Sequence, residues 1–264
     1  MSQGVGNGVS GVGARNVGQR RDGEGARGAE VGTAEALTAR RRARPRSPLS
    51  HPLARPLIFA VCLIPFALLA WNAYHDNLGA NPIEALEIHT GVWTLRFLVI
   101  TLSITPARKL LGWNGLARYR RMLGLFTFFY ACVHLSMYIG VDMFFNVHDI
   151  LHDIVKHPYI TVGMASFLML LPLAVTSTAG WVKRLGGRRW VALHRLIYLI
   201  AVGGTLHYMW AVKKDIRDPL IYASIFAALL GYRLWITSGR TVRATIGMFA
   251  ERASPPRTSH APPP

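Results

Sequence analysis

Six long apolar stretches constrain the fold of this 264-residue chain more than any other feature of its sequence. They run over residues 57–74, 91–111, 122–141, 159–178, 191–210 and 220–236. Each is close to the roughly 20 residues that a helix needs to cross about 30 Å of hydrocarbon. Soluble core helices of this length would show a polar face, and these stretches mostly do not. The sequence therefore predicts an all-α integral membrane protein, with a six-transmembrane helix bundle over residues 57–236.

The two ends of the chain lie outside this predicted bundle. Residues 1–56 are rich in Gly, Ala, Arg and Ser and contain no Phe, Tyr or Trp. They offer too little apolar surface to form a core, so we expect a disordered Gly/Arg-rich cytoplasmic arm. Residues 237–264 are basic and end in Pro-rich sequence, which predicts a second disordered segment, a cytoplasmic tail.

The formal net charge is +17, although only 16% of the residues are charged. The arm holds 10 Arg against 4 acidic residues, and the tail holds 4 Arg against 1 acidic residue. Between the stretches, basic residues concentrate in 112–121 and 179–190, whereas 75–90 and 142–158 are acidic. By the positive-inside rule, this alternation predicts an inner-membrane protein with both termini in the cytoplasm. The charge needs no nucleic-acid partner, and membrane lipid is the partner expected for the basic arm.

The cysteines exclude several classes of site. Cys62 and Cys132 both lie inside apolar stretches, with no CxxC and no CxxCH motif. A disulfide framework, a zinc site built from cysteines and a covalently attached haem are therefore excluded. Buried thiols that behave as small hydrophobes are the expected role.

Histidines are the most informative polar residues inside the stretches. His134 lies in the third stretch, and His194 and His207 lie in the fifth. Ionisable groups at such positions are costly and indicate function. Neutral imidazole is a common axial ligand of haem iron, and helix bundles hold cofactors between facing helices. The alternative is three buried histidines that donate to neighbouring carbonyls, but three on two helices favour haem.

Depth in the membrane suggests how these histidines pair. At 1.5 Å per residue, His134 lies about 18 Å from the cytoplasmic start of its stretch, His207 about 24 Å and His194 about 5 Å. Axial ligands of one haem must lie at similar depth, so we predict His134 and His207 as the iron ligands of one b-type haem. His194 is left for a second haem with a different ligand, or for a cofactor contact. On an ideal helix it is about 140° from His207, and Gly203-Gly204 is a place for distortion.

A series of short motifs follows in a fixed order along the bundle. The motifs are Thr90-Gly91-Val92-Trp93, Thr101-Leu102-Ser103-Ile104-Thr105-Pro106, Arg120-Arg121-Met122-Leu123-Gly124-Leu125, Tyr130-Ala131-Cys132-Val133-His134, His157-Pro158-Tyr159-Ile160-Thr161-Val162-Gly163, Thr176-Ser177, His194-Arg195-Leu196-Ile197-Tyr198 and His207-Tyr208-Met209-Trp210. As a series they resemble the haem-binding membrane subunits of the protein-methionine-sulfoxide reductase system, the MsrQ or YedZ family. The resemblance covers about 57–236 and places the chain in the ferric-reductase-like transmembrane group.

This resemblance implies an electron-transfer subunit that is not itself the catalytic subunit. It implies one or two b-type haems, with His134, His194 and His207 as the haem-associated histidines, and an FMN. Electrons are expected to pass from the quinone pool to a periplasmic molybdopterin-containing reductase that repairs oxidised methionines.

Larger ferric-reductase relatives differ from this chain in two respects. They carry two histidines on the third span, whereas here the position 13 or 14 before His134 is Arg121 or Arg120, which leaves the number of haems open. They also append a soluble flavin and nicotinamide domain. Only residues 237–264 follow the last stretch here, so the expected reductant is quinol or a separate protein.

Three arginines on the cytoplasmic side suggest a place for the flavin. Our hypothesis is that Arg118, Arg120 and Arg121 hold the FMN phosphate, since Arg suits bidentate phosphate contacts. Two other functions stay open at this point. One is a haem-containing transmembrane reductase of ferric or cupric ions, and the other is a membrane scaffold or transporter without a cofactor.

Overall fold

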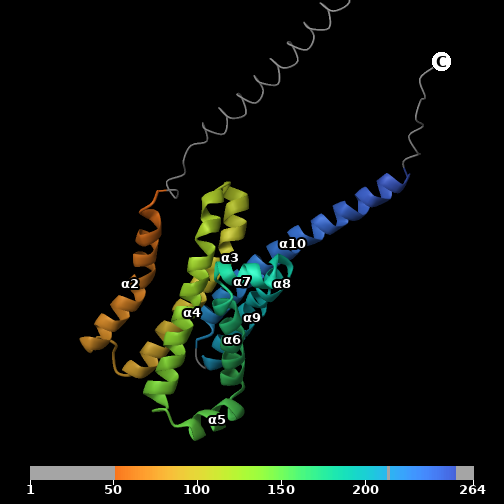
Figure 1. The fold of residues 1–264 in the computed structure, drawn as a ribbon. Coiled ribbons are helices and arrows are strands. Elements are labelled where there is room, and N and C mark those ends of the chain that lie inside the picture. Colours follow the sequence, from red (N-terminus) through yellow and green to blue (C-terminus); the bar gives the residue numbers. More distant parts are fainter. Residues whose placement is uncertain (1–50, 213–214, 254–264) are drawn as a thin grey trace, which may run out of the picture. The chain divides into compact units, whose positions relative to one another are not determined.

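A computed structural model describes residues 51–212 and 215–253 of the chain, with side chains up to residue 238 (Figure 1). The described residues belong to one compact unit that begins at Leu49. Of the predicted arm, residues 1–50 lie outside the described residues, as do residues 254–264 of the predicted tail. Residues 54–56 of the arm belong to α2 and residues 237–253 of the tail belong to α10, so these parts are helical instead.

Helices account for all the regular structure of the described residues, which contain no strand. The longer ones are α2 (Ala54–Tyr74), α3 (Pro82–Leu111), α4 (Arg120–Ser136), α6 (Pro158–Val175), α9 (Leu196–Ala211) and α10 (Arg217–Ala253). The shorter ones are η2 (Asn114–Arg118), the π-helix η3 (Met137–Asp142), α5 (Val147–Lys156), α7 (Ala179–Leu185) and α8 (Gly187–Leu193). Six segments are long and apolar enough to cross a membrane: Ala54–Tyr74, Pro82–Leu111, Arg120–Asp142, Pro158–Val175, Gly187–Ala211 and Arg217–Ser238. The prediction of an all-α bundle of six transmembrane helices is confirmed.

The helix boundaries differ from the predicted stretches at two places. α3 begins at Pro82, nine residues before the predicted start at 91. Asn81 caps it by accepting a hydrogen bond from the Glu84 amide, and proline is favoured at the first helical position. α10 continues to Ala253, well beyond the predicted end at 236. In both cases the added turns include charged residues, such as Glu84 in α3 and Arg240 in α10, so hydropathy alone did not include them in a helix.

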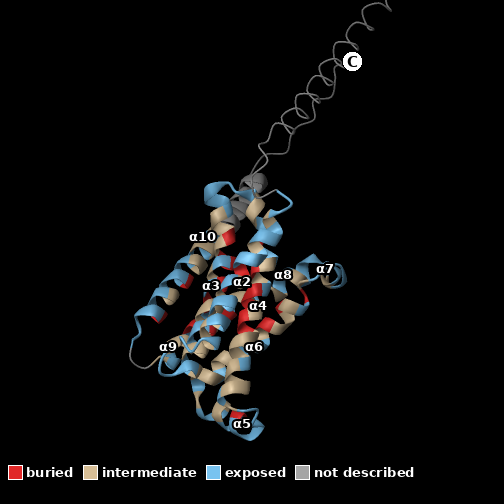
Figure 2. Ribbon diagram, turned by 90° about the vertical axis from the view of Figure 1, so that its left-hand side faces the viewer, coloured by how far each residue is buried: buried red, intermediate tan, exposed pale blue. Residues whose placement is uncertain are grey.

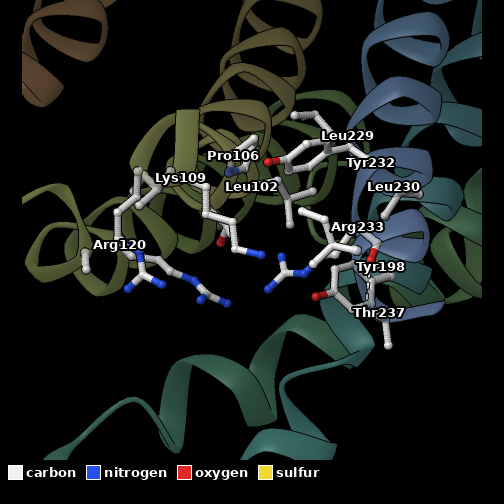
Figure 3. Close-up of a pocket in the computed structure, with 15 residues that line it drawn as sticks. Leu102, Pro106, Lys109, Arg120, Tyr198, Leu229, Leu230, Tyr232, Arg233 and Thr237 are labelled. Atoms are coloured by element: carbon white, nitrogen blue, oxygen red, sulfur yellow. Dashed lines mark hydrogen bonds between the residues drawn. The ribbon is translucent and has the colours of Figure 1, made fainter. Parts of the chain in front are cut away.

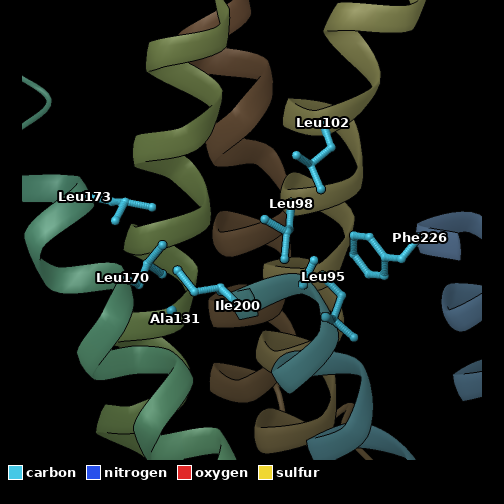
Figure 4. Close-up of a cluster of buried hydrophobic side chains, with 9 residues drawn as sticks. Leu95, Leu98, Leu102, Ala131, Leu170, Leu173, Ile200 and Phe226 are labelled. Atoms are coloured by element: carbon cyan, nitrogen blue, oxygen red, sulfur yellow. The ribbon is translucent and has the colours of Figure 1, made fainter. Parts of the chain in front are cut away.

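Two clusters of buried side chains hold the bundle together. The first joins five helices (Figure 4), through Leu95, Leu98 and Leu102 of α3, Ala131 of α4, Leu170 and Leu173 of α6, Ile200 and Ala201 of α9 and Phe226 of α10. The second joins α2 to α3 and α4 around Phe97, Phe126 and Tyr130. By contrast, α2 and α10 keep large apolar side chains exposed, such as Leu57 and Leu234 (Figure 2). Such surface suits contact with lipid tails.

Glycines allow the helices to approach one another closely. A methyl group added at Gly203 of α9 would collide with Ser166 Oγ of α6, and one at Gly204 would lie 3.3 Å from Leu95 of α3. Small residues at helix contacts are typical of membrane bundles. The glycine pair therefore serves close packing, and α9 stays helical across it.

Candidate functional site

The bundle brings the rings of His134 and His207 next to each other. His134 lies in the last turn of α4 and His207 in the last turns of α9, at the end of the bundle that also carries α5 (Figure 1). Their ring centroids are 6.0 Å apart and the ring planes are inclined by 71°. The pair that the depth argument selected is thus adjacent in space.

Each ring of this pair is held by a backbone carbonyl from a third and a fourth helix. His134 Nδ1 lies 3.0 Å from the Glu87 carbonyl oxygen of α3 and 3.3 Å from Thr90 Oγ1. His207 Nδ1 lies 2.7 Å from the Tyr159 carbonyl oxygen of α6. A carbonyl only accepts, so Nδ1 carries the proton in each ring and Nε2 keeps its lone pair. Among the described residues, neither Nε2 has a hydrogen-bond partner, which leaves it available to a metal ion.

Two glycines provide the room for these rings. A methyl group added at Gly91 of α3 would lie 3.2 Å from His134 Cε1. One added at Gly163 of α6 would lie 2.7 Å from His207 Nδ1 and 2.9 Å from its Cε1. Since real side chains do not approach so closely, the ring of His207 needs a glycine at position 163.

His194 lies apart from this pair, at the junction between α8 and α9. Its ring stacks on Trp190 with 3.9 Å between centroids, and Nδ1 lies 3.0 Å from the Trp190 carbonyl oxygen. Its Nε2 is buried and has no hydrogen-bond partner among the described residues. Because the helix is interrupted at 194–195, the angle of an ideal helix does not relate His194 to His207. His194 Nε2 thus makes no hydrogen bond of good geometry, although the backbone of Leu173 also lies close to the ring.

The three predicted arginines do not converge on one point. Arg120 lines a pocket of about 350 Å³ between α3, α4, α9 and α10, at the end of the bundle opposite to α5 (Figure 3). Arg118 stacks on the Tyr119 ring at 5.3 Å instead. Neither Arg118 nor Arg121 is among the described residues that line this pocket.

Sequence reasoning did not assign a role to the residues that hold the histidines. Gly91 and Gly163 stood inside the motifs, and a glycine within an apolar stretch is a signal from which a close contact could have been predicted. The carbonyls of Glu87 and Tyr159 left no such signal, because any residue type provides a carbonyl. One Glu87 carboxylate oxygen, Oε1, is also buried without a hydrogen-bond partner among the described residues.

Comparison with known proteins gives a consistent result. Residues 58–205 match the family described as the ferric reductase like transmembrane component. A protein of Herminiimonas arsenicoxydans is 52% identical over 191 residues, which is 72% of this chain and 88% of that protein. A protein of Rhodospirillum rubrum is 55% identical over 182 residues, covering 69% and 88%, and one of Xanthomonas euvesicatoria is 48% identical over 211 residues, covering 77% and 93%. All three are named protein-methionine-sulfoxide reductase heme-binding subunit MsrQ. No solved structure matches the chain.

Proposed function

The chain belongs to the MsrQ family within the ferric reductase-like transmembrane group, and on this premise we propose that it is the haem-binding electron-transfer subunit of a protein-methionine-sulfoxide reductase system. The observation that carries this proposal is the pair His134 and His207, 6.0 Å apart, each with Nδ1 tied to a carbonyl and Nε2 free. This arrangement fits two ligands of one metal centre better than two structural histidines. A structural histidine in a helix bundle is expected to have both ring nitrogens hydrogen-bonded.

In this proposal Nε2 of His134 and Nε2 of His207 hold the iron of a b-type haem. The haem supplies reversible one-electron chemistry at its iron when bound. The carbonyls of Glu87 and Tyr159 fix the tautomer and orientation of the two rings, as outer partners of metal-bound histidines generally do. Leu95, Leu98 and Ala131 in the adjacent core exclude water from the interior of the bundle.

His194 offers a second position for haem or another cofactor. Its buried Nε2 lies at the opposite half of the bundle from the His134–His207 pair, and within the described part of the chain no second histidine contacts it. We expect His194→Ala to remove only the fraction of haem held at this second position. Haem quantified in that variant therefore reports whether the protein holds one haem or two.

The proposed path of electrons runs from the quinone pool, by way of haem b and FMN, to a periplasmic molybdopterin-containing reductase that repairs oxidised methionines in periplasmic proteins. The protein lies in the inner membrane with both termini in the cytoplasm. Two features support this orientation. Six crossings return the chain to the side on which it started, and the pocket end of the bundle carries the arginine-rich connections.

FMN is proposed to bind at the cytoplasmic end, with its phosphate near Arg118, Arg120 and Arg121. Arg120 is the member of this set that lines a pocket, so it is expected to contribute most. An Arg120→Ala, Arg121→Ala double variant should lose FMN, measured by the fluorescence of flavin released from purified protein. Unchanged FMN content in that variant would contradict the proposed flavin site without affecting the haem site.

The haem proposal is tested by a dithionite-reduced minus oxidised absorbance spectrum of the purified protein. We expect the bands of a b-type cytochrome, and we expect His134→Ala and His207→Ala each to remove most of the haem. His89→Ala is the matched control, because His89 is an exposed histidine of α3 outside the pair. A spectrum without haem bands would end the cytochrome proposal, and a full haem complement in either ligand variant would refute the assigned pair.

A further inference from the structure

The pocket at the end of the bundle opposite to α5 gathers positive charge from three different helices. Arg108 and Lys109 come from the last turn of α3, Arg120 from the first turn of α4, and Arg233 from α10. Figure 3 shows the side chains of Arg120 and Arg233 reaching from opposite walls toward the same hollow. The described residues that line the pocket include no Asp and no Glu.

Three of the four cations of the pocket lack an acidic partner among the described residues. Among the described residues, Arg108, Arg120 and Arg233 form no ion pair with a carboxylate. Arg233 is half-buried, with its guanidinium 5.0 Å from the centre of the Tyr198 ring, so it is held in place at the wall of the pocket. Arg108 and Arg120 are exposed and Arg233 is half-buried, so these like charges repel one another at a strength that water reduces in part. An anion in the pocket would remove this cost.

The general excess of basic residues on the cytoplasmic side does not account for this arrangement. Lys183, Arg184, Arg188 and Arg189 lie at the same end of the bundle, exposed on the short helices α7 and α8. Basic residues that serve only to orient the protein in the membrane are expected to be exposed and dispersed in this way. The pocket differs because its cations surround a volume of about 350 Å³. One part of its wall is apolar and includes Leu102, Leu229 and Leu230, and the rest includes hydroxyl-bearing residues such as Tyr198 and Thr105.

We propose that this pocket is a binding site for the phosphate group of an amphiphile, with Arg108, Arg120 and Arg233 as its cationic partners. Guanidinium groups match phosphate oxygens in a bidentate manner, and basic pockets between transmembrane helices bind anionic head groups. The apolar wall receives the uncharged part of the ligand. Such a phosphate is carried by an acidic phospholipid or by FMN. The site extends beyond the flavin arginines of the proposed function, since it adds residues of α3 and α10 and shares only Arg120.

The test compares Arg108→Gln, Arg233→Gln and the control Arg188→Gln, an exposed arginine at the same end outside the pocket. Each protein is purified in mild detergent, and its content of FMN, of acidic phospholipid and of haem is measured per mole of protein. Loss of a charge-assisted hydrogen bond should weaken binding about tenfold or more. We therefore expect Arg108→Gln and Arg233→Gln to contain less of either FMN or acidic phospholipid and the wild-type amount of haem. Arg188→Gln should contain the wild-type amount of all three.

The outcomes separate the two sources of phosphate. Loss of FMN identifies the cofactor as the ligand, and loss of acidic phospholipid with FMN retained identifies the lipid. Wild-type levels of both in Arg108→Gln and Arg233→Gln would overturn the proposal, as would a wild-type protein that holds neither. Arg233→Lys, which keeps the charge, should retain more ligand than Arg233→Gln even if the latter folds poorly. Absence of haem from the wild type would instead refute the proposed function and leave the phospholipid result interpretable.

Discussion

Gly163 and Gly91 leave the space that the rings of His207 and His134 occupy. We predict that Gly163→Ala lowers haem content strongly, because the new methyl group would lie 2.7 Å from His207 Nδ1 and must displace the ring. Gly91→Ala should lower it less, since its closest approach to His134 is 3.2 Å. The ratio of haem absorbance to protein absorbance after purification measures both effects.

Gly231→Ala is the control for these substitutions. Gly231 lies inside α10 with no atom near the position of an added methyl group. Exchange of glycine for alanine within a helix favours the helix by about 1 kcal/mol, so this variant should fold at least as well as the wild type and keep its haem. Equal haem loss in Gly231→Ala and Gly163→Ala would show that contact with the His207 ring is not the cause.

The two histidines of the pair were predictable from the sequence, but the groups that contact their rings were not. His134 and His207 were selected because ionisable groups are rare in apolar spans and because their depths agree, and both properties depend on chain position alone. The carbonyls that hold the rings come from Glu87 and Tyr159, 47 and 48 residues away along the chain. Such contacts depend on the packing of α3 and α6, which no local pattern encodes. Of the predicted set of Arg118, Arg120 and Arg121, Arg120 is the member that lines the pocket, and the other cations that line it come from α3 and α10, elsewhere along the chain.

A side chain of α4 bonds to the backbone of α2 next to a proline. Pro65 lies within α2, and near it the Tyr130 hydroxyl accepts a hydrogen bond from the Phe66 amide and donates one to the Cys62 carbonyl. The hydroxyl thus stands between two groups that would bond directly in a regular helix. We predict that Tyr130→Phe destabilises the protein by about 1–3 kcal/mol, measured by thermal unfolding in detergent. Tyr74→Phe, at an exposed tyrosine, should have no effect.

A double-mutant cycle with Pro65→Ala tests the cause of this effect. Without the proline, the Phe66 amide and the Cys62 carbonyl are able to bond to each other, so Tyr130→Phe should cost less in that background. An equal cost in both backgrounds would mean that the effect of the Tyr130 hydroxyl does not depend on the proline. The sequence alone identifies Pro65 as a proline inside a helix. That Tyr130, 65 residues later, bonds to the backbone beside it follows only from the packing of α2 against α4.

The number and order of the membrane helices were the most predictable property of the whole molecule. Hydropathy depends on composition over about 20 residues, and this signal persists whatever the helices pack against. The ends of α3 and α10 were less predictable, because a capping residue such as Asn81 and polar turns outside the hydrocarbon extend a helix without raising its hydropathy. The prediction that remains to be tested at this scale is the side of the membrane on which each connection lies.

Single cysteines placed in a Cys62→Ala, Cys132→Ala background provide that test. Asn77 and His148 lie in connections on the α5 side of the bundle, and Asn114 and Arg188 lie in connections on the opposite side; all four are exposed. If the basic connections are cytoplasmic, an impermeant maleimide added to spheroplasts should label Asn77→Cys and His148→Cys. Asn114→Cys and Arg188→Cys should react only after the membrane is opened. The reverse pattern would invert the orientation and place the His134–His207 pair near the cytoplasm, which is incompatible with delivery of electrons to a periplasmic partner. A split within either pair of sites would contradict the six-span topology itself.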